Sequence, residues 1–290
     1  MEKGENMKIY DMHIHTGFGE PKPGYLIEKM EEAGVYGGAL ISACPKESTI
    51  GNLLCLDYKE RIDNLLRWTR ESDRLFPVLY VHPHEKYVKD KIKDAAERGV
   101  AAFKMICDNY AVDSRESLEV IEAIERTEKP IIFHTGILWS GTDTSKYNRP
   151  VGWECMLNFK RIKFSMGHCS WPWHDECIAV YGKFLNRYNV EKSSEMFFDI
   201  TPGTPEIYRR ELLTKLFCVG YDVNDNIMFG TDSISTEYDP QWVKRWLKLD
   251  GSIMDELGVA AEVREKIYCN NFMRFLNGGD VSHSLPQMNK

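Results

Sequence analysis

The 290-residue sequence predicts an α/β fold, namely a (β/α)8 or TIM barrel. Three observations support this prediction. The chain contains eight short β-rich runs, and each run is followed by a predicted helix. Consecutive runs begin 25 to 38 residues apart, which is the length of one βα unit.

The eight predicted strands are marked by apolar, β-branched or aromatic residues. They span residues 7–14, 37–42, 75–81, 100–106, 129–134, 161–167, 195–200 and 227–231. Apolar residues recur at helical spacing in the segments between them, which include residues 25–34, 87–99 and 114–127. The longer helical stretch from Asp239 to Leu276 is expected to close the bottom and side of the barrel.

A doubly wound open sheet is the alternative fold. Such a sheet usually has fewer strands, and no Gly-x-Gly-x-x-Gly motif follows the first predicted strand here. No linker rich in Pro, Gly or Ser, low-complexity tract or repeat divides the sequence. Residues 1–290 are therefore expected to form a single domain.

The composition is that of an ordinary globular protein. Lys and Arg number 37 against 44 Asp and Glu, so the formal net charge is −7 and no basic stripe is available for nucleic acid. No apolar run reaches the roughly 18 residues of a membrane helix, and the N-terminus lacks an apolar signal core. The eight cysteines are dispersed without Cys-x-x-Cys, which favours reduced thiols. We expect a cytoplasmic protein that binds neither membranes nor nucleic acid.

Ligand-type side chains stand at the ends of four predicted strands, where such a barrel carries its chemistry. The first strand ends in His13 and His15, which period-two alternation places on one face. His134 ends the fifth strand, His168 follows the sixth and Asp232 follows the eighth. Four imidazoles and a carboxylate on one rim suit a divalent metal ion.

These motifs resemble the amidohydrolase superfamily, specifically the amidohydrolase-related group that contains aminocarboxymuconate-semialdehyde decarboxylase. The resemblance rests on Asp-x-His-x-His at the first strand, on Thr-Gly after His134, on Gly before His168 and on Gly-Thr before Asp232. It covers nearly the whole chain and implies a distorted barrel of the metal-dependent hydrolase type.

The resemblance implies that His13, His15 and His134 bind one divalent metal ion and that Asp232 completes or borders its shell. Asp232 would then accept a proton from a metal-activated water, and His168 would polarise the substrate carbonyl. Zn²⁺ is the ion expected first, and Mn²⁺, Fe²⁺ or Co²⁺ also suit these ligands.

Lys104 and Asp11 each have two interpretations. Lys104 either bridges two metal ions as a carboxylated lysine or stays an amine within the site, and the resemblance favours the amine and a single metal ion. Asp11 either orients a ligand imidazole or ties parts of the barrel together.

The loop after the fifth strand, residues 137–153, and the segment after the sixth are expected to shape the substrate pocket. A loop arginine could hold a carboxylate, and tryptophans could wall the mouth. The candidate substrate-binding residues are Trp139, Arg149, Trp171 and Trp173. His82 and His84 suit the pocket rim or a helix start better than a metal, and His174 is expected on the surface.

The sequence thus predicts a metal-dependent hydrolase of a small carbonyl substrate such as a lactone, amide or ester. The alternative is a metal-dependent decarboxylase of a small unsaturated or aromatic acid, because one fold and one ligand set serve both reactions. A metal-binding barrel without turnover is a third, less favoured option. A small molecule is the expected partner, and a homodimer is compatible with the exposed helices of such a barrel.

Overall fold

A parallel sheet of nine strands forms the centre of the computed structural model, which describes residues 7–17, 24–50, 54–191, 193–203 and 205–276. The strands follow the order β10-β9-β8-β7-β6-β5-β2-β1-β11. They are β1 (Tyr10–His15), β2 (Gly37–Ile41), β5 (Leu75–Tyr80), β6 (Ala102–Met105), β7 (Ile131–Phe133), β8 (Lys163–Met166), β9 (Glu195–Asp199), β10 (Ile227–Met228) and β11 (Ser233–Ile234). Successive strands of the chain lie side by side, as consecutive βα units require.

The sheet closes into a barrel at its two ends. β10 pairs with β9, whereas β11, the next strand along the chain, pairs with β1. Between these two pairs, the amide of Met12 donates a hydrogen bond to the carbonyl oxygen of Phe229, at 2.9 Å. β10 and β11 therefore share the eighth strand position, and the predicted distorted (β/α)8 barrel is confirmed.

The prediction of one continuous strand over residues 227–231 is wrong, because the strand ends at Met228. A Cβ atom on Gly230 would lie 2.1 Å from Oγ1 of Thr201. The amide and hydroxyl of Thr231 donate to the carboxylate of Asp11, at 3.0 and 2.5 Å, instead of continuing the sheet. Asp11 thus ties β1 to the eighth strand position, which is the second of its two interpretations.

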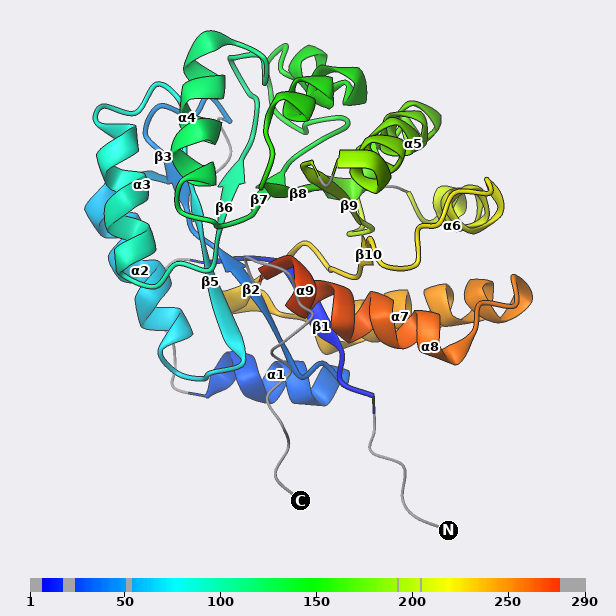
Figure 1. The fold of residues 1–290 in the computed structure, drawn as a ribbon. Helices are drawn as coiled ribbons and strands as arrows, with labels where there is room; N and C mark the ends of the chain where they lie inside the picture. Colours follow the sequence, from blue (N-terminus) through cyan, green and yellow to red (C-terminus); the bar gives the residue numbers. More distant parts are fainter. Residues whose placement is uncertain (1–6, 18–23, 51–53, 192, 204, 277–290) are drawn as a thin grey trace, which may run out of the picture.

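Helices surround the sheet (Figure 1). They are α1 (Tyr25–Ala33), α2 (Tyr58–Thr69), α3 (Val88–Glu97), α4 (Arg115–Glu125), α5 (His174–Glu191), α6 (Arg209–Cys218), α7 (Pro240–Glu256), α8 (Ala261–Glu265) and α9 (Asn271–Leu276). Local sequence sets several of their ends. Asp57 and Glu60 form a capping box before α2, and Gly34 ends α1 with a φ of 81°, a conformation that favours glycine.

The connection after β7 differs from the regular βα pattern. It contains two 3₁₀ helices, Ser145–Asn148 and Pro150–Asn158, where a regular unit has an α-helix. Arg149 between them is extended, and Pro150 supplies no amide hydrogen to continue a helix from the first segment. A further short pair of strands, β3 (Cys44–Pro45) and β4 (Cys55–Leu56), lies outside the main sheet.

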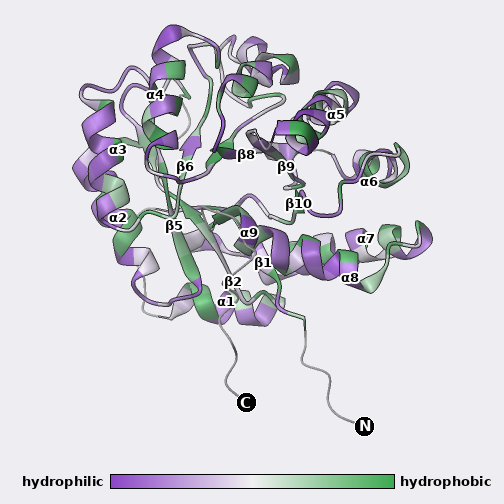
Figure 2. Cartoon of the chain, in the orientation of Figure 1, coloured by the Kyte–Doolittle hydropathy of each residue, from purple (hydrophilic) through white to green (hydrophobic). Residues whose placement is uncertain are grey.

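The last helix plugs the bottom of the barrel, as the helical stretch near the C-terminus predicts. Phe272 stacks on Tyr10 of β1 with ring centroids 4.7 Å apart, and Phe275 meets Phe197 of β9 edge to face at 5.1 Å. In Figure 2, β5 is drawn in hydrophobic colours, whereas α3 and α8 carry large hydrophilic stretches. This pattern is expected for a parallel sheet buried on both faces. Within the described ranges, none of the helices has the length and apolar content needed to cross a bilayer.

Candidate metal centre

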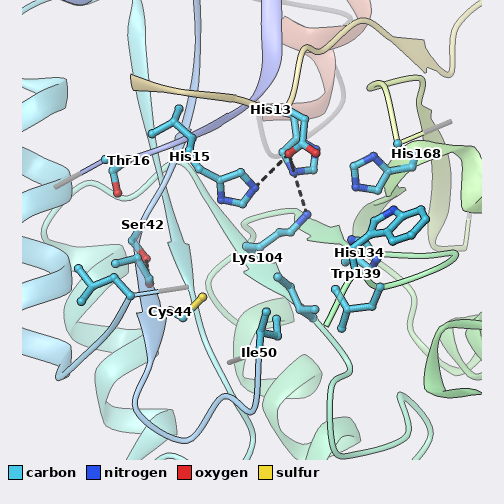
Figure 3. Close-up of a pocket in the computed structure, with 18 of the residues that line it drawn as sticks. His13, His15, Thr16, Ser42, Cys44, Ile50, Lys104, His134, Trp139 and His168 are labelled. Carbon is cyan, nitrogen blue, oxygen red and sulfur yellow. Dashed lines mark hydrogen bonds and ion pairs between the residues drawn. The ribbon is translucent and has the colours of Figure 1, made fainter. Parts of the chain in front are cut away.

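Polar side chains from separate strand ends converge on one cavity of about 660 Å³. Figure 3 shows His13, His15 and Lys104 together at this cavity, with His134 and His168 beside them. Asp232 also lines it. The cavity lies where the strands end, as expected for a site in this fold.

His13, His15 and Asp232 form the tightest part of the site. One candidate ligand atom from each of them lies within 4.8 Å of the others, as a shared metal ion requires. Oδ1 of Asp232 lies 3.3 Å from Nε2 of His15 and 3.7 Å from Nε2 of His13. Two imidazole nitrogens and a carboxylate oxygen fit a divalent transition metal and leave coordination positions open toward the cavity.

The backbone around Asp232 is held in a special conformation. Asp232 has a φ of 57°, in the left-handed region that is uncommon for a residue other than glycine. The neighbouring Thr231 is fixed by its two hydrogen bonds to Asp11, and Tyr238 donates a third to the same carboxylate, at 3.0 Å. This buried network fixes the direction in which the Asp232 side chain leaves the chain.

Asp199 orients His13, and the sequence analysis missed this residue. Its Oδ2 lies 2.7 Å from Nδ1 of His13, while the amide of Thr201 donates to its Oδ1 at 2.8 Å. Burial raises the pKa of Asp199, but the positive charge and hydrogen bond of His13 outweigh burial and bring that pKa to about 2. The ionised carboxylate keeps a proton on Nδ1 of His13, so that Nε2 carries the lone pair that a metal ion would need.

The position of Asp199 at a strand end was a usable signal. It is the last residue of β9, as His15 is the last residue of β1. Apolar residues mark the predicted strand 195–200, and Asp199 is the carboxylate at its end.

Lys104 lies directly beside the metal group. It is fully buried, and its Nζ lies 3.3 Å from Nε2 of His13. Burial lowers the pKa of Lys104 to about 8, although Asp199 and Asp232 act in the opposite direction. The described residues hold one group of three side chains that could bind a metal ion, His13, His15 and Asp232, and Lys104 lies next to it.

His134 lies in the cavity wall but not within the tight group. Its Nε2 faces the carbonyl oxygen of Ile137 at 3.3 Å, and its ring centroid is 4.9 Å from that of His168. Burial, together with the charges of His168 and Lys104, lowers the pKa of His134 well below its ordinary value. The ring is therefore neutral near pH 7, as a metal ligand must be.

The charge states of the other ligands also suit a cation. Burial lowers the pKa of His13 to about 4, Lys104 acts in the same direction, and Asp199 and Asp232 oppose them. Burial raises the pKa of Asp232, but its hydrogen bond to His15 and the charges of His13 and His168 hold that pKa well below its usual range. At neutral pH the His13 imidazole is neutral and the Asp232 carboxylate is ionised, so both could bind a metal ion without first losing a proton.

His168 faces the same cavity from the other side of His13. Their ring centroids lie 5.3 Å apart, and Nδ1 of His168 is 3.4 Å from the carbonyl oxygen of Thr201. The backbone of His168 has a φ of 55°, and a Cβ atom on Gly203 would lie 2.6 Å from its Nδ1. Glycine at position 203 thus leaves the space that the His168 ring occupies.

The four residues proposed from the sequence to bind substrate separate into two pairs. Trp139 and Trp171 line the cavity and lie nearly parallel, with ring centroids 6.3 Å apart. Arg149 and Trp173 do not line it, so their predicted role is not supported. The reason is that Arg149 forms an ion pair with Glu176 and lies over the Trp173 ring, 4.7 Å from its centroid.

Three further histidines lie outside the cavity lining. His82 is buried, and its Nε2 lies 3.0 Å from Oδ1 of Asp108, while His84 is exposed. His174 is buried, which corrects the expectation that it lies on the surface. Its Nδ1 donates to the carbonyl oxygen of Cys169, at 2.9 Å.

Comparison with known proteins gives one family match. A family model described as amidohydrolase matches residues 10–278. The comparison with curated proteins gives no match.

Several solved structures share the fold at low sequence identity. A probable 2-pyrone-4,6-dicarboxylic acid hydrolase from Acinetobacter baumannii, with citric acid bound, has a TM-score of 0.62 and 14% identity over 93% of this chain and 99% of its own. The 2,6-dihydroxybenzoate decarboxylase from Rhizobium has a TM-score of 0.63 and 11% identity over 93% and 98%. Dihydroorotase from Campylobacter jejuni has a TM-score of 0.58 and 14% identity over 92% and 82%. At such identities the likeness shows the barrel fold alone.

Proposed function

The chain belongs to the amidohydrolase family, and we propose that it is a metal-dependent hydrolase of a small carbonyl substrate such as a lactone, amide or ester. The observation that carries this proposal is the group of His13, His15 and Asp232 at the floor of a cavity of about 660 Å³. Cavities of this size accommodate small organic ligands.

The proposed metal ion is a single Zn²⁺, held by His13, His15 and Asp232, with His134 as a further candidate ligand. Such an ion lowers the pKa of a coordinated water from about 15.7 to about 7. A single ion, with Lys104 as an amine beside it, is proposed because the described residues hold one group of three candidate ligands.

Asp232 is the proposed proton acceptor. Its side chain is 35% exposed and lines the cavity, so a water in the cavity can reach it. Its low pKa keeps the carboxylate ionised at neutral pH. The carboxylate can therefore take a proton from the attacking water and return it to the leaving group.

His168 and Lys104 are the proposed hydrogen-bond donors to the substrate. His168 lines the cavity opposite the metal group, and an N–H of its ring can stabilise the oxyanion that develops from the carbonyl oxygen. Lys104 supplies three donors in the cavity floor, where low solvent access strengthens them.

Decarboxylation is the second candidate, and one observation favours it. Lys104 and His168 face the same cavity, so two groups that can carry a proton lie near a bound acid. Loss of CO₂ from an unsaturated or aromatic acid leaves a carbanion that takes up one proton, and either side chain could supply it. The similar fold of a decarboxylase adds no argument about the reaction.

The test uses Asp232→Asn with two parallel assays. The wild-type protein and the variant are each incubated with panels of lactones, amides, esters and aromatic acids, and proton release and CO₂ are recorded. We expect turnover by the wild-type protein and a loss of about 10²-fold or more in the variant, because Asp232 is both a proposed ligand and the proposed proton acceptor; metal content is determined on the same samples. CO₂ without hydrolysis would replace the first candidate by the second. Full activity of the variant would contradict the proposed role of Asp232.

A further inference from the structure

The cavity has a polar floor, formed by His13, His15, Lys104 and Asp232, and an apolar wall. Ile50, Ile106 and Leu138 line it, and all three belong to one hydrophobic cluster of the protein. Ile50 and Ile106 are almost completely buried, and Leu138 is partly buried. Figure 3 shows Ile50 and Trp139 beside the polar side chains of the floor. A substrate that reaches the floor must therefore place part of its body against hydrocarbon.

The rim continues this apolar wall with aromatic rings. Trp139 is 69% exposed, and the planes of Trp139 and Trp171 differ by 14°. Tyr208 extends the row, with its ring centroid 6.1 Å from that of Trp171. Exposed aromatic faces at the mouth of a cavity favour a flat, uncharged group of a ligand over water.

In the described part of this wall, fixed positive charge is scarce. Among the described lining residues, Lys104 is the one lysine or arginine, and its side chain is buried. Glu237 lines the exposed rim and adds a negative charge there. Arg149, the arginine of the neighbouring loop, is held by Glu176 and Trp173 outside the lining.

These charges match one anionic group of a substrate at most. A single carboxylate or oxyanion would meet Lys104 and the cation bound by the His13, His15 and Asp232 group. A second carboxylate on the same small molecule would lie against the apolar wall or near Glu237. An unpaired charge in an apolar site is costly, and recognition of carboxylates ordinarily uses arginine.

We propose that the cavity selects a neutral or monoanionic substrate with an apolar, ring-sized body and rejects dicarboxylates. This inference rests on the proposed function, because the proposed metal ion binds the one anionic group of the substrate. It adds the substrate class, and it identifies Ile50, Ile106, Leu138 and Trp139 as the residues that set it.

The test is a binding measurement on full-length, metal-loaded protein, with metal content determined on the same sample. Isothermal titration calorimetry compares benzoate, salicylate and cinnamate with isophthalate, which is benzoate with a second carboxylate. We expect at least one monocarboxylate to bind, and isophthalate to bind roughly tenfold or more weakly than benzoate. Isophthalate binding as tight as benzoate, or no binding by any of the three monocarboxylates, would overturn the proposal.

A variant with an added arginine tests independently whether the lack of a second cation sets the ligand preference. Ile234 lines the rim and is 43% exposed, so Ile234→Arg places a cation at the cavity without burying it. We expect this variant to reduce the preference for benzoate over isophthalate. Val190→Arg is the matched control, since Val190 is 77% exposed on α5 and does not line the cavity. An equal change in both variants would show a general charge effect and would count against the proposal.

The result is separable from the proposed function. If the ligand preference holds but the protein binds no metal and turns over no substrate, the proposed reaction fails while the selectivity stands. If metal is bound and a lactone is hydrolysed but dicarboxylates bind as tightly as monocarboxylates, the selectivity fails while the reaction stands.

Discussion

The carboxylate of Asp199, at the end of β9, contacts His13 of β1 with one oxygen and Thr201, two residues later in the chain, with the other. Oδ2 lies 2.7 Å from Nδ1 of His13, while Oδ1 accepts the amide of Thr201 at 2.8 Å and also its hydroxyl. Both oxygens therefore accept protons from fixed donors. A carboxylate satisfies this arrangement, whereas an amide of the same shape cannot, because one of its two ends is a donor.

This relationship predicts that Asp199→Asn impairs metal binding without a change of volume. Either the NH₂ group faces His13 and displaces the proton from Nδ1 to Nε2, or it faces the amide of Thr201. We expect metal affinity to fall by roughly 10- to 100-fold. Competition with a chromophoric chelator measures this change.

The matched control is Asp222→Asn, which removes the same charge from an exposed position that does not line the cavity. It is expected to leave metal affinity unchanged. Equal affinity of Asp199→Asn and the wild-type protein would show that the Asp199 contact does not set the His13 tautomer.

The close packing around Gly230 predicts that an alanine at this position destabilises the protein. A Cβ atom there would lie 2.1 Å from Oγ1 of Thr201 and 3.1 Å from Cβ of His13. Thr201 cannot rotate away without losing its hydroxyl bond to Asp199. We expect Gly230→Ala to lower the free energy of unfolding by about 1–3 kcal/mol and to weaken metal binding.

Gly251→Ala is the contrasting variant for the same measurement. Gly251 lies in α7, and a Cβ atom there would have no neighbour within 4 Å. Alanine is the better helix former, so this variant should gain about 0.5–1 kcal/mol in urea unfolding. Similar losses in both variants would contradict the proposed crowding at Gly230.

His174 predicts part of the pH dependence of stability. Burial lowers the pKa of His174 below its ordinary value, so the unfolded chain takes up a proton at a higher pH than the native chain does. The stability that His174 contributes is therefore complete above about pH 6.5 and is lost as the pH falls toward the native pKa. Its bond to Cys169 holds the turn that follows His168.

The comparison variant is His174→Gln, whose amide can still donate to the Cys169 carbonyl but does not titrate. Unfolding free energies of the wild-type protein and the variant, measured in urea at pH 8 and pH 5.5, give the effect. We expect the wild-type protein to lose more stability than the variant between the two pH values. An equal loss would assign the pH dependence to other groups.

The fold was predictable because its signal is local and repeated. Eight apolar runs at the spacing of one βα unit indicate the barrel without any knowledge of contacts. The break between Met228 and Ser233 was not predictable in the same way. It depends on Gly230 meeting Thr201 and on Thr231 meeting Asp11, and these partners are far away in the sequence.

The site was predictable where it depends on strand ends. Period-two alternation brings His13 and His15 together, and the end of the eighth strand supplies Asp232. The orientation of His134 toward Ile137 and the pairing of Arg149 with Glu176 depend on loop conformation, which a single sequence does not encode as a pattern. Asp199 has no spacing motif of its own, and its place at the end of a strand is the one signal in the sequence that points to it.

The content of bound metal tests the central claim most directly. Protein is purified without a polyhistidine tag and without chelator, incubated with Zn²⁺ or Mn²⁺, desalted and measured by elemental analysis, beside His13→Ala. We predict about one equivalent of a transition metal per chain in the wild-type protein and its loss in the variant. Essentially no metal in the wild-type protein would contradict the metal-dependent site, and about two equivalents would contradict the single-ion arrangement with Lys104 as an amine.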